Sequence, residues 1–186
     1  MSNITGGIIM HKDIERILFS EEEIEEKCKE LAKKIDEDYA QADSIFAIGL
    51  LKGSVPFMAE LCKNIQTPLT MNYMQVSSYE GSQSGELKIK HDLEDSVDGK
   101  YVLIIEDILD TGKTLKTVKQ LLLDRGAKEV KVVTLLDKVE GRQFDFVTDY
   151  YGFECPNAFV VGYGLDFNEN YRQLPYVGVL KEECYK

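Results

Sequence analysis

The densest group of chemically active residues runs from Glu106 to Thr114 and reads EDILDTGKT. Its second half, from Asp110 onward, combines small residues, hydroxyl groups and a lysine just before a segment with helical periodicity. Backbone N–H groups at the start of a helix attract anions, so this half predicts a phosphate-binding loop. On spacing alone, an ordinary turn with a helix cap is an equal alternative.

The first half of the same segment, Glu106-Asp107, places two carboxylates side by side at the end of an apolar run. Such a pair beside a phosphate loop would hold sugar hydroxyls or a metal ion, whereas alone it would fit a solvated strand end equally well. Together with the loop, the pair favours a functional site.

Two common nucleotide-binding motifs are excluded by single positions. A Walker P-loop requires a glycine five positions before Gly112, where the chain has Asp107. The dinucleotide fingerprint would need a third glycine after Gly162 and Gly164, and Phe167 occupies that position.

The elements around this segment predict how it is positioned. The apolar run Tyr101 to Ile105 predicts a buried strand, followed by a loop over 108–112 and a helix that ends at Gly126. A second apolar strand is expected over 130–136. Strand, helix and strand in this order form a βαβ unit of a parallel sheet, whose ligands bind beyond the carboxyl ends of the strands. Lys52-Gly53-Ser54 and residues 136–138 are expected at that edge.

The remaining pattern predicts one α/β domain over residues 1–186, because no linker divides the chain. A capping box at Ser20 and Glu23 begins a helix, and a second helix is expected over 55–65. Further strands are expected over 45–51, 70–77, 86–90, 144–148, 158–162 and 176–180. The small, polar stretch 78–85 predicts a flexible loop.

Composition narrows the functional classes. The 186 residues include 33 acidic and 22 basic ones, a net charge of −11, and show no basic stripe of the kind that nucleic-acid binders carry. No apolar run reaches the roughly 18 residues of a membrane span, and no signal peptide is visible. The four scattered cysteines predict reduced thiols in the cytoplasm rather than disulfides or a zinc site.

The segment IIEDILDTGKT resembles the signature of the type I phosphoribosyltransferases. Four more segments, within the region from about 45 to 179, resemble the hypoxanthine-guanine branch of that family: LLKGS at 50–54, SSYEG at 77–81, LLDKVEGR at 135–142 and AFVVGYGLDFNENYR at 158–172. The resemblance implies a mainly parallel central sheet flanked by helices, a small hood from the N- and C-terminal segments, and a flexible active-site loop at about 78–85.

The resemblance also implies a reaction. A purine salvage enzyme of this kind, a glycosyltransferase of the pentosyl type, transfers the 5-phosphoribosyl group from 5-phosphoribosyl-1-pyrophosphate (PRPP) to hypoxanthine or guanine. The products are IMP or GMP and pyrophosphate. Mg²⁺ is the implied cofactor, the implied assembly is a homodimer or homotetramer, and neither nucleic acid nor membrane is an expected partner.

The resemblance assigns functions around the sugar and its phosphates to the residues of this chain that match the family's motifs. Asp110 is the implied general base near purine N7. The 5′-phosphate cradle is implied for Asp110, Thr111, Gly112, Lys113 and Thr114. Ribose and metal binding are implied for Glu106 and Asp107, with Asp166 as a further metal ligand.

The remaining roles concern pyrophosphate and the base. Lys52, Gly53 and Arg172 are the implied pyrophosphate ligands, and the Leu51–Lys52 peptide bond is expected to be cis when that ligand is bound. Purine binding is implied for Lys138, Phe159, Val160 and Asp166, with Lys138 donating to purine O6. Ser78 and Tyr79 match the closing loop.

Alternatives remain at several of these positions. Arg172 could form only an ion pair with Glu169, and Phe159 could be a core residue. Ser54 stands where many relatives carry a glycine. A regulator on the same fold that binds PRPP or nucleotide together with a nucleic acid is the second functional hypothesis. The sequence does not rank hypoxanthine, guanine and xanthine.

Overall fold

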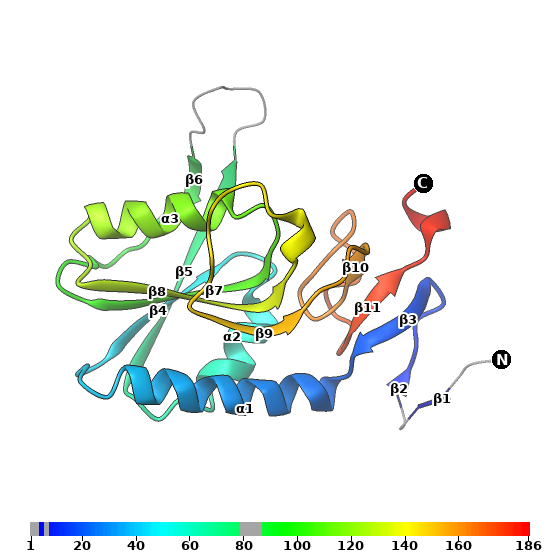
Figure 1. The fold of residues 1–186 in the computed structure, drawn as a ribbon, viewed down its shortest axis with the longest axis horizontal. Helices are drawn as coiled ribbons and strands as arrows, with labels where there is room; N and C mark the ends of the chain where they lie inside the picture. The colour runs from blue at the N-terminus through cyan, green and yellow to red at the C-terminus, as the bar shows by residue number, and fades with distance from the viewer. Residues whose placement is uncertain (1–3, 6–7, 79–86) are drawn as a thin grey trace.

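A six-stranded sheet forms the centre of the computed structural model, which describes residues 4–5, 8–78 and 87–186 (Figure 1). In spatial order its strands are β6 (Leu87–His91), β5 (Leu69–Ser78), β4 (Ile45–Leu50), β7 (Tyr101–Leu109), β8 (Glu129–Asp137) and β9 (Tyr150–Glu154). Only the β5–β6 pair is antiparallel; the pairs from β5 across to β9 are parallel. The expected α/β fold with a mainly parallel sheet is confirmed.

The parallel register brings the candidate site residues to one edge. Ile45 pairs with Tyr101, and Tyr101 pairs with Glu129, so strands β4, β7 and β8 start level. Their carboxyl ends, at Leu50, Leu109 and Asp137, therefore meet at the same edge of the sheet. β4 is buried along its whole length, as its unbroken apolar sequence predicts.

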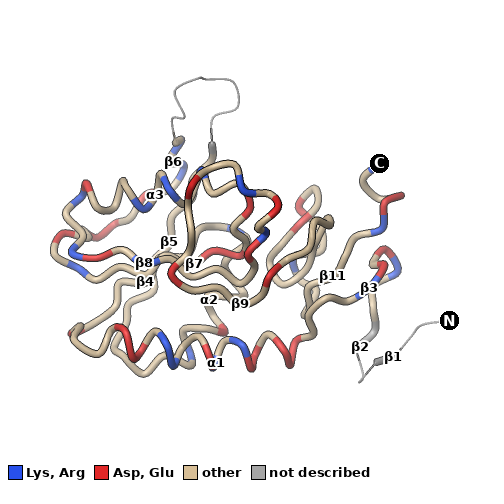
Figure 2. The backbone as a smooth tube through the Cα atoms, viewed as in Figure 1, with Lys and Arg blue, Asp and Glu red and all other residues tan. Residues whose placement is uncertain are grey.

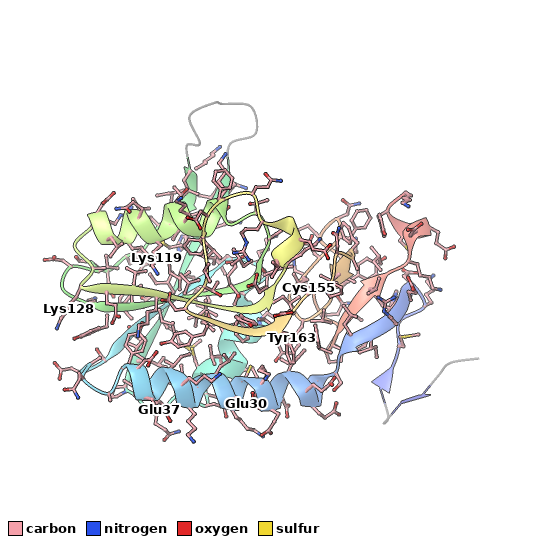
Figure 3. All side chains as sticks on the ribbon, viewed as in Figure 1. Glu30, Glu37, Lys119, Lys128, Cys155 and Tyr163 are labelled. Carbon is pink, nitrogen blue, oxygen red and sulfur yellow. The ribbon has the colours of Figure 1, made fainter. Side chains whose placement is uncertain are left out.

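Helices cover both faces of the sheet. α1 (Glu21–Asp38) and α2 (Val55–Cys62) pack on one face, and α3 (Lys113–Asp124) packs on the other (Figure 1). The predicted capping box begins α1, with Ser20 and Glu23 bonded reciprocally. Figure 3 shows side chains filling both layers, with Glu30 and Glu37 on the outward side of α1.

Segments from both ends of the chain form a smaller sheet beside the central one. Its strand order is β10 (Val160–Val161), β11 (Val177–Leu180) and β3 (Ile14–Phe19), all antiparallel. A two-stranded pair, β1 (Ile4–Thr5) with β2 (Ile8–Ile9), precedes it. Two short 3-10 helices, η1 (Val139–Gly141) and η2 (Glu182–Cys184), complete the described elements.

Several predicted boundaries differ from the structure. β7 continues through Leu109, so Glu106 and Asp107 belong to a strand and not to the loop after it. The predicted strand over 144–148 is wrong, because this stretch is irregular and leaves Phe144 and Val147 exposed; the strand lies at β9 instead. β10 is shorter than expected, and α2 ends at Cys62. Within the described ranges, no helix has the length and apolar character to cross a membrane.

Candidate active site

The connection from β7 to α3 forms the predicted phosphate loop. Gly112 adopts a positive φ of 85° and turns the chain directly into the helix that begins at Lys113. Gly112 has no side chain to cap this helix, and among the described residues the one side-chain acceptor at its first turn is Thr111 Oγ1, which accepts from the Lys113 N–H at 3.4 Å. The next N–H groups of the first turn, which have no partner inside a helix, are therefore available to an anion.

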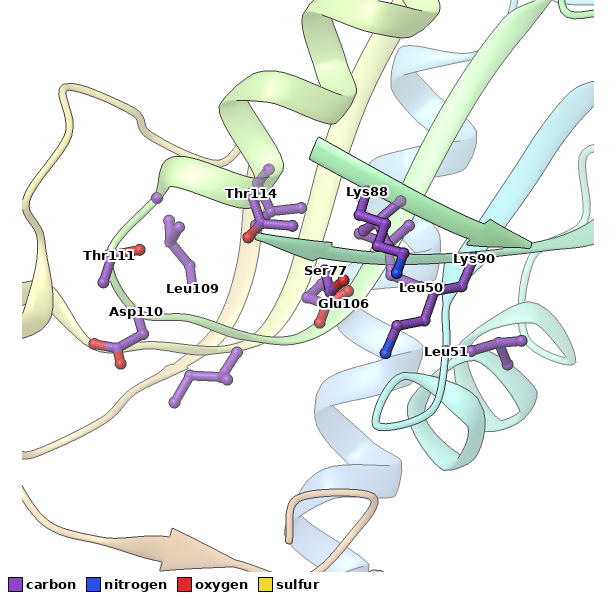
Figure 4. Close-up of a pocket in the computed structure, with 14 residues that line it drawn as sticks. Leu50, Leu51, Ser77, Lys88, Lys90, Glu106, Leu109, Asp110, Thr111 and Thr114 are labelled. Atoms are coloured by element: carbon purple, nitrogen blue, oxygen red, sulfur yellow. The ribbon is translucent and has the colours of Figure 1, made fainter. Parts of the chain in front are cut away.

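A pocket of about 760 Å³ opens between this loop, the end of β4 and the β5–β6 ribbon (Figure 4). Its polar lining comes from two expected sources, the phosphate loop with Asp110 and the Glu106 carboxylate, and from the β5–β6 ribbon. The lining residues are Leu50, Leu51, Val76, Ser77, Lys88, Lys90, Glu106, Ile108, Leu109, Asp110, Thr111, Gly112, Thr114 and Leu115.

The two adjacent carboxylates, Glu106 and Asp107, lie near the end of β7, and their side chains approach each other within hydrogen-bond reach. Glu106 lines the pocket. Asp107 is buried and accepts a hydrogen bond from the Ile108 N–H at 2.8 Å.

Burial dominates the electrostatics of this pair. It raises the pKa of Glu106 well above its usual value, and the neighbouring Asp107 charge raises it further. Burial also raises the pKa of Asp107, against the opposing effect of its hydrogen bonds and the Arg172 charge. Glu106 Oε2 is buried and has no hydrogen-bond partner among the described residues. A carboxylate left unsatisfied in this way fits a site completed by a metal ion or by ligand hydroxyls.

The connection from β4 to α2 carries the expected pyrophosphate residues. The Leu51–Lys52 peptide bond is cis, which is the geometry expected for the pyrophosphate-bound state. Gly53 is buried directly against Asp107, and a Cβ at position 53 would overlap the Asp107 carboxylate. Ser54, the departure from the family pattern, is fully buried and donates a hydrogen bond to the Leu50 carbonyl at 2.7 Å. The serine therefore ties this loop to the end of β4.

An acidic residue joins the two expected pyrophosphate cations. Glu169 contacts Lys52 Nζ at 2.6 Å and Arg172 Nη2 at 3.1 Å. Arg172 also contacts Asp166 at 2.9 Å and donates to the Gly164 carbonyl at 2.7 Å. The structure thus brings Lys52, Gly53 and Arg172 to one place, with both cations paired. The linking role of Glu169 was not predicted.

The expected purine-binding residues lie at the junction of the two sheets. Lys138 Nζ donates to the carbonyl of Ala158, the residue before Phe159, at 3.4 Å. Phe159 is 37% exposed and stacks on Tyr185 with ring centroids 4.9 Å apart, so it is not a core residue. Val160 is buried in β10, and Asp166 is held by Arg172.

The segment that follows β8 supports the phosphate loop through its main chain. The Lys138 N–H donates to Leu109 O at 2.9 Å, and the Phe144 N–H donates to Thr111 O at 3.1 Å. Gly141 lies against Asp110, so close that a side chain at 141 would overlap the carboxylate. The segment LLDKVEGR was recognised, but the pairing of its main chain with the phosphate loop has no signal in residue type.

Not every predicted grouping is present. Asp166 pairs with Arg172 instead of joining Glu106 and Asp107, and no cluster of three potential metal ligands occurs among the described residues. Tyr79 lies outside the described residues, as does the 78–85 loop apart from the backbone of Ser78 at the end of β5. Lys88 and Lys90 line the pocket without having been predicted; their alternation in a hairpin strand was the available signal.

Comparisons with known proteins agree with this geometry. Residues 17–168 match the family described as the phosphoribosyl transferase domain. The hypoxanthine-guanine phosphoribosyltransferase of Bacillus subtilis is 53% identical over 180 residues, 96% of this chain and 99% of that protein. The Streptococcus pneumoniae enzyme of the same name is 50% identical over 95% of this chain and 99% of its own.

Solved structures give the same result. A hypoxanthine phosphoribosyltransferase from Staphylococcus aureus superposes with a TM-score of 0.91 at 46% identity, covering 98% of this chain and 100% of that one. A Trypanosoma cruzi hypoxanthine phosphoribosyltransferase in complex with the product IMP has a TM-score of 0.91 at 40% identity, covering 96% and 100%.

Proposed function

Because the chain belongs to the phosphoribosyltransferase family, we propose that it is a purine salvage enzyme that transfers the 5-phosphoribosyl group from PRPP to hypoxanthine or guanine. The products are IMP or GMP and pyrophosphate. The observation that carries the proposal is one pocket that combines a helix N-terminus, a buried carboxylate and an exposed Asp110 at the carboxyl edge of a parallel sheet.

The pocket explains how the sugar would be oriented. The free amides of the first turn of α3 and the hydroxyls of Thr111 and Thr114, which line the pocket, bind the 5′-phosphate. Lys113, the first residue of α3, adds positive charge at the loop. Glu106 lies between this loop and the β4 end, where the ribose hydroxyls belong. Fixing both ends of the ribose aligns its C1′ with the incoming base and accounts for part of the rate enhancement.

The transition state has oxocarbenium character, as in glycoside hydrolysis, and carries developing positive charge on the sugar. Asp110 is exposed beside the phosphate loop and is positioned by Gly141. It takes the proton from purine N7 and its charge favours the developing cation. Lys138 donates to purine O6, Phe159 stacks on the base, and the main chain at Val160 and Asp166 binds the base edge.

Glu106 and Asp107 fit a magnesium ion. Both are carboxylates, the ligand type that Mg²⁺ prefers, and Glu106 Oε2 is buried without a partner in the described chain. Bound Mg²⁺ supplies positive charge that offsets the diphosphate. Gly53 lets the diphosphate approach the main chain, and Arg172 contacts it from the Glu169 side. Ser78 and Tyr79 belong to the segment that excludes water.

A nucleic-acid-binding regulator on the same fold is not favoured. The net charge is −11, and Figure 2 shows Lys and Arg scattered among Asp and Glu along the described chain. We expect a cytoplasmic homodimer or homotetramer, which light scattering and cell fractionation will test.

The deciding experiment is pyrophosphate release from PRPP and Mg²⁺ with hypoxanthine, guanine, xanthine or adenine. We expect turnover with hypoxanthine and guanine and very little with adenine. Omission of Mg²⁺ should abolish turnover. Release of pyrophosphate with none of the oxopurines would refute the proposal.

A further inference from the structure

Strand β6 directs two lysines into the active-site pocket. Leu87 and Ile89 pack against the core, so the alternating residues Lys88 and Lys90 are exposed on the other side of the strand. Both line the pocket. Figure 4 shows their side chains extending from β6 toward the part of the pocket where Leu50 and Glu106 lie.

The charged residues that line the pocket indicate that these lysines bind an anion. Its charged lining consists of Glu106 and Asp110 on one side and Lys88 and Lys90 on the other. Among the described residues, neither lysine forms an ion pair, whereas Lys52 and Arg172 are both paired with Glu169. Among the residues that line this pocket, the cations available to an anion are therefore those of β6.

Strand order identifies which anion they face. β6 neighbours β5, whose Ser77 pairs with Lys88, and β5 in turn neighbours β4. Adjacent strands are about 4.8 Å apart, so β6 lies about 10 Å from the β4 end, a gap that long lysine side chains largely bridge. The phosphate loop follows β7, on the far side of β4. The lysines thus belong to the diphosphate end of the pocket.

We propose that Lys88 and Lys90 bind the diphosphate of PRPP and the pyrophosphate product by ion pairs. This assignment rests on the proposed function, because that function places a diphosphate at the end of β4. The two lysines act on binding and not on the chemical step, and they offset the repulsion between an acidic protein and an anionic substrate.

The test compares Lys88→Gln, Lys90→Gln and the double variant with Lys116→Gln, which removes the same charge from an exposed position on α3 outside the pocket. We expect the double variant to raise the KM for PRPP about tenfold or more, since hydrogen bonds to charged groups are among the stronger ones. The KM for hypoxanthine at saturating PRPP should change less than twofold. The salt dependence of the PRPP KM should weaken. Lys116→Gln should leave all of these constants unchanged. The charge-conserving double variant Lys88→Arg with Lys90→Arg should keep PRPP binding close to that of the unaltered protein.

Titration calorimetry with magnesium pyrophosphate and with IMP provides a readout that does not depend on turnover. The double variant should bind pyrophosphate about tenfold more weakly and IMP as tightly as the unaltered protein. Equal weakening of both ligands, or no weakening of pyrophosphate binding, would overturn the assignment. Failure of the proposed function would appear differently, as absence of transfer to any oxopurine by the unaltered protein.

Discussion

The substitution Gly53→Ala tests whether the main chain, rather than a side chain, forms the pyrophosphate site. A methyl group at position 53 would overlap the Asp107 carboxylate. That carboxylate is buried and is tied to the Ile108 N–H at 2.8 Å, so it cannot simply rotate away. Either the β4–α2 loop or the end of β7 must therefore shift.

Overpacking of this kind costs about 1–3 kcal/mol. If the displaced loop loses that much interaction with the diphosphate, the KM for PRPP rises roughly 5- to 150-fold. Lys52→Ala should have a smaller effect, because its side chain is 56% exposed and pairs with Glu169, which is 64% exposed. Such exposed pairs contribute about 0.2–1 kcal/mol.

The assay is initial-rate kinetics with varied PRPP at saturating hypoxanthine, with thermal unfolding measured in parallel. Ser54→Ala is the matched control, because it removes the hydrogen bond to Leu50 O without adding atoms to the loop. A PRPP KM for Gly53→Ala within twofold of the unaltered value would refute the steric argument. A larger effect from Lys52→Ala than from Gly53→Ala would show that side-chain charge, and not the main chain, binds the diphosphate.

Three further substitutions test the other site residues. Asp110→Asn should lower kcat about 10²- to 10⁴-fold while PRPP affinity changes little, as expected for loss of a general base; near-normal kcat with both oxopurines would remove Asp110 from the mechanism. Lys138→Gln should raise the ratio of adenine to hypoxanthine kcat/KM about 5- to 150-fold, because an unmatched buried donor costs about 1–3 kcal/mol; an unchanged ratio would contradict its role as selector. Glu106→Gln should flatten the pH dependence of the free energy of unfolding. Burial raises the pKa of Glu106, so above pH 4.5 the folded protein binds more protons than the unfolded chain. The stability of the unaltered protein therefore falls as the pH rises from 4.5 through the pKa of Glu106 in the folded state. Thermal unfolding between pH 5 and 8 measures this, and parallel curves for the two proteins would disprove it; the variant should also lose its stabilisation by PRPP with Mg²⁺.

The parallel core was predictable because its signal is local. The apolar runs at β4, β7 and β8 and the capping box of α1 are written in consecutive residues, and the structure confirms each of them. A strand was wrongly predicted over 144–148 because the apolar residues of this stretch alternate as they do in a strand. In the structure its start is instead tied to the phosphate loop, where Phe144 N–H bonds to Thr111 O.

The missed parts of the site depend on contacts between distant segments. Glu169 meets Lys52 across 117 residues of chain, and no local pattern indicates that pairing. Glu106 and Asp107 lie within β7 because the strand extends past them to Leu109, which apolar content alone did not show. Lys88 and Lys90 were part of a predicted strand, but their place in the pocket depends on the antiparallel pairing of β6 with β5 at the edge of the sheet.

The main-chain bonds between residues 138–144 and 109–111 have a consequence for ligand cooperativity. Through them, the backbone of the proposed base-selecting Lys138 and the proposed phosphate loop form a single hydrogen-bonded unit. A ligand that orders residues 138–144 also restricts residues 109–111, and the reverse holds too. The second ligand then meets a segment that is already ordered and loses less conformational entropy on binding. A free purine and a free phosphate should consequently strengthen each other's binding by the same factor in either order of addition. A nucleotide, which carries both groups on one molecule, gains this coupling in a single binding event.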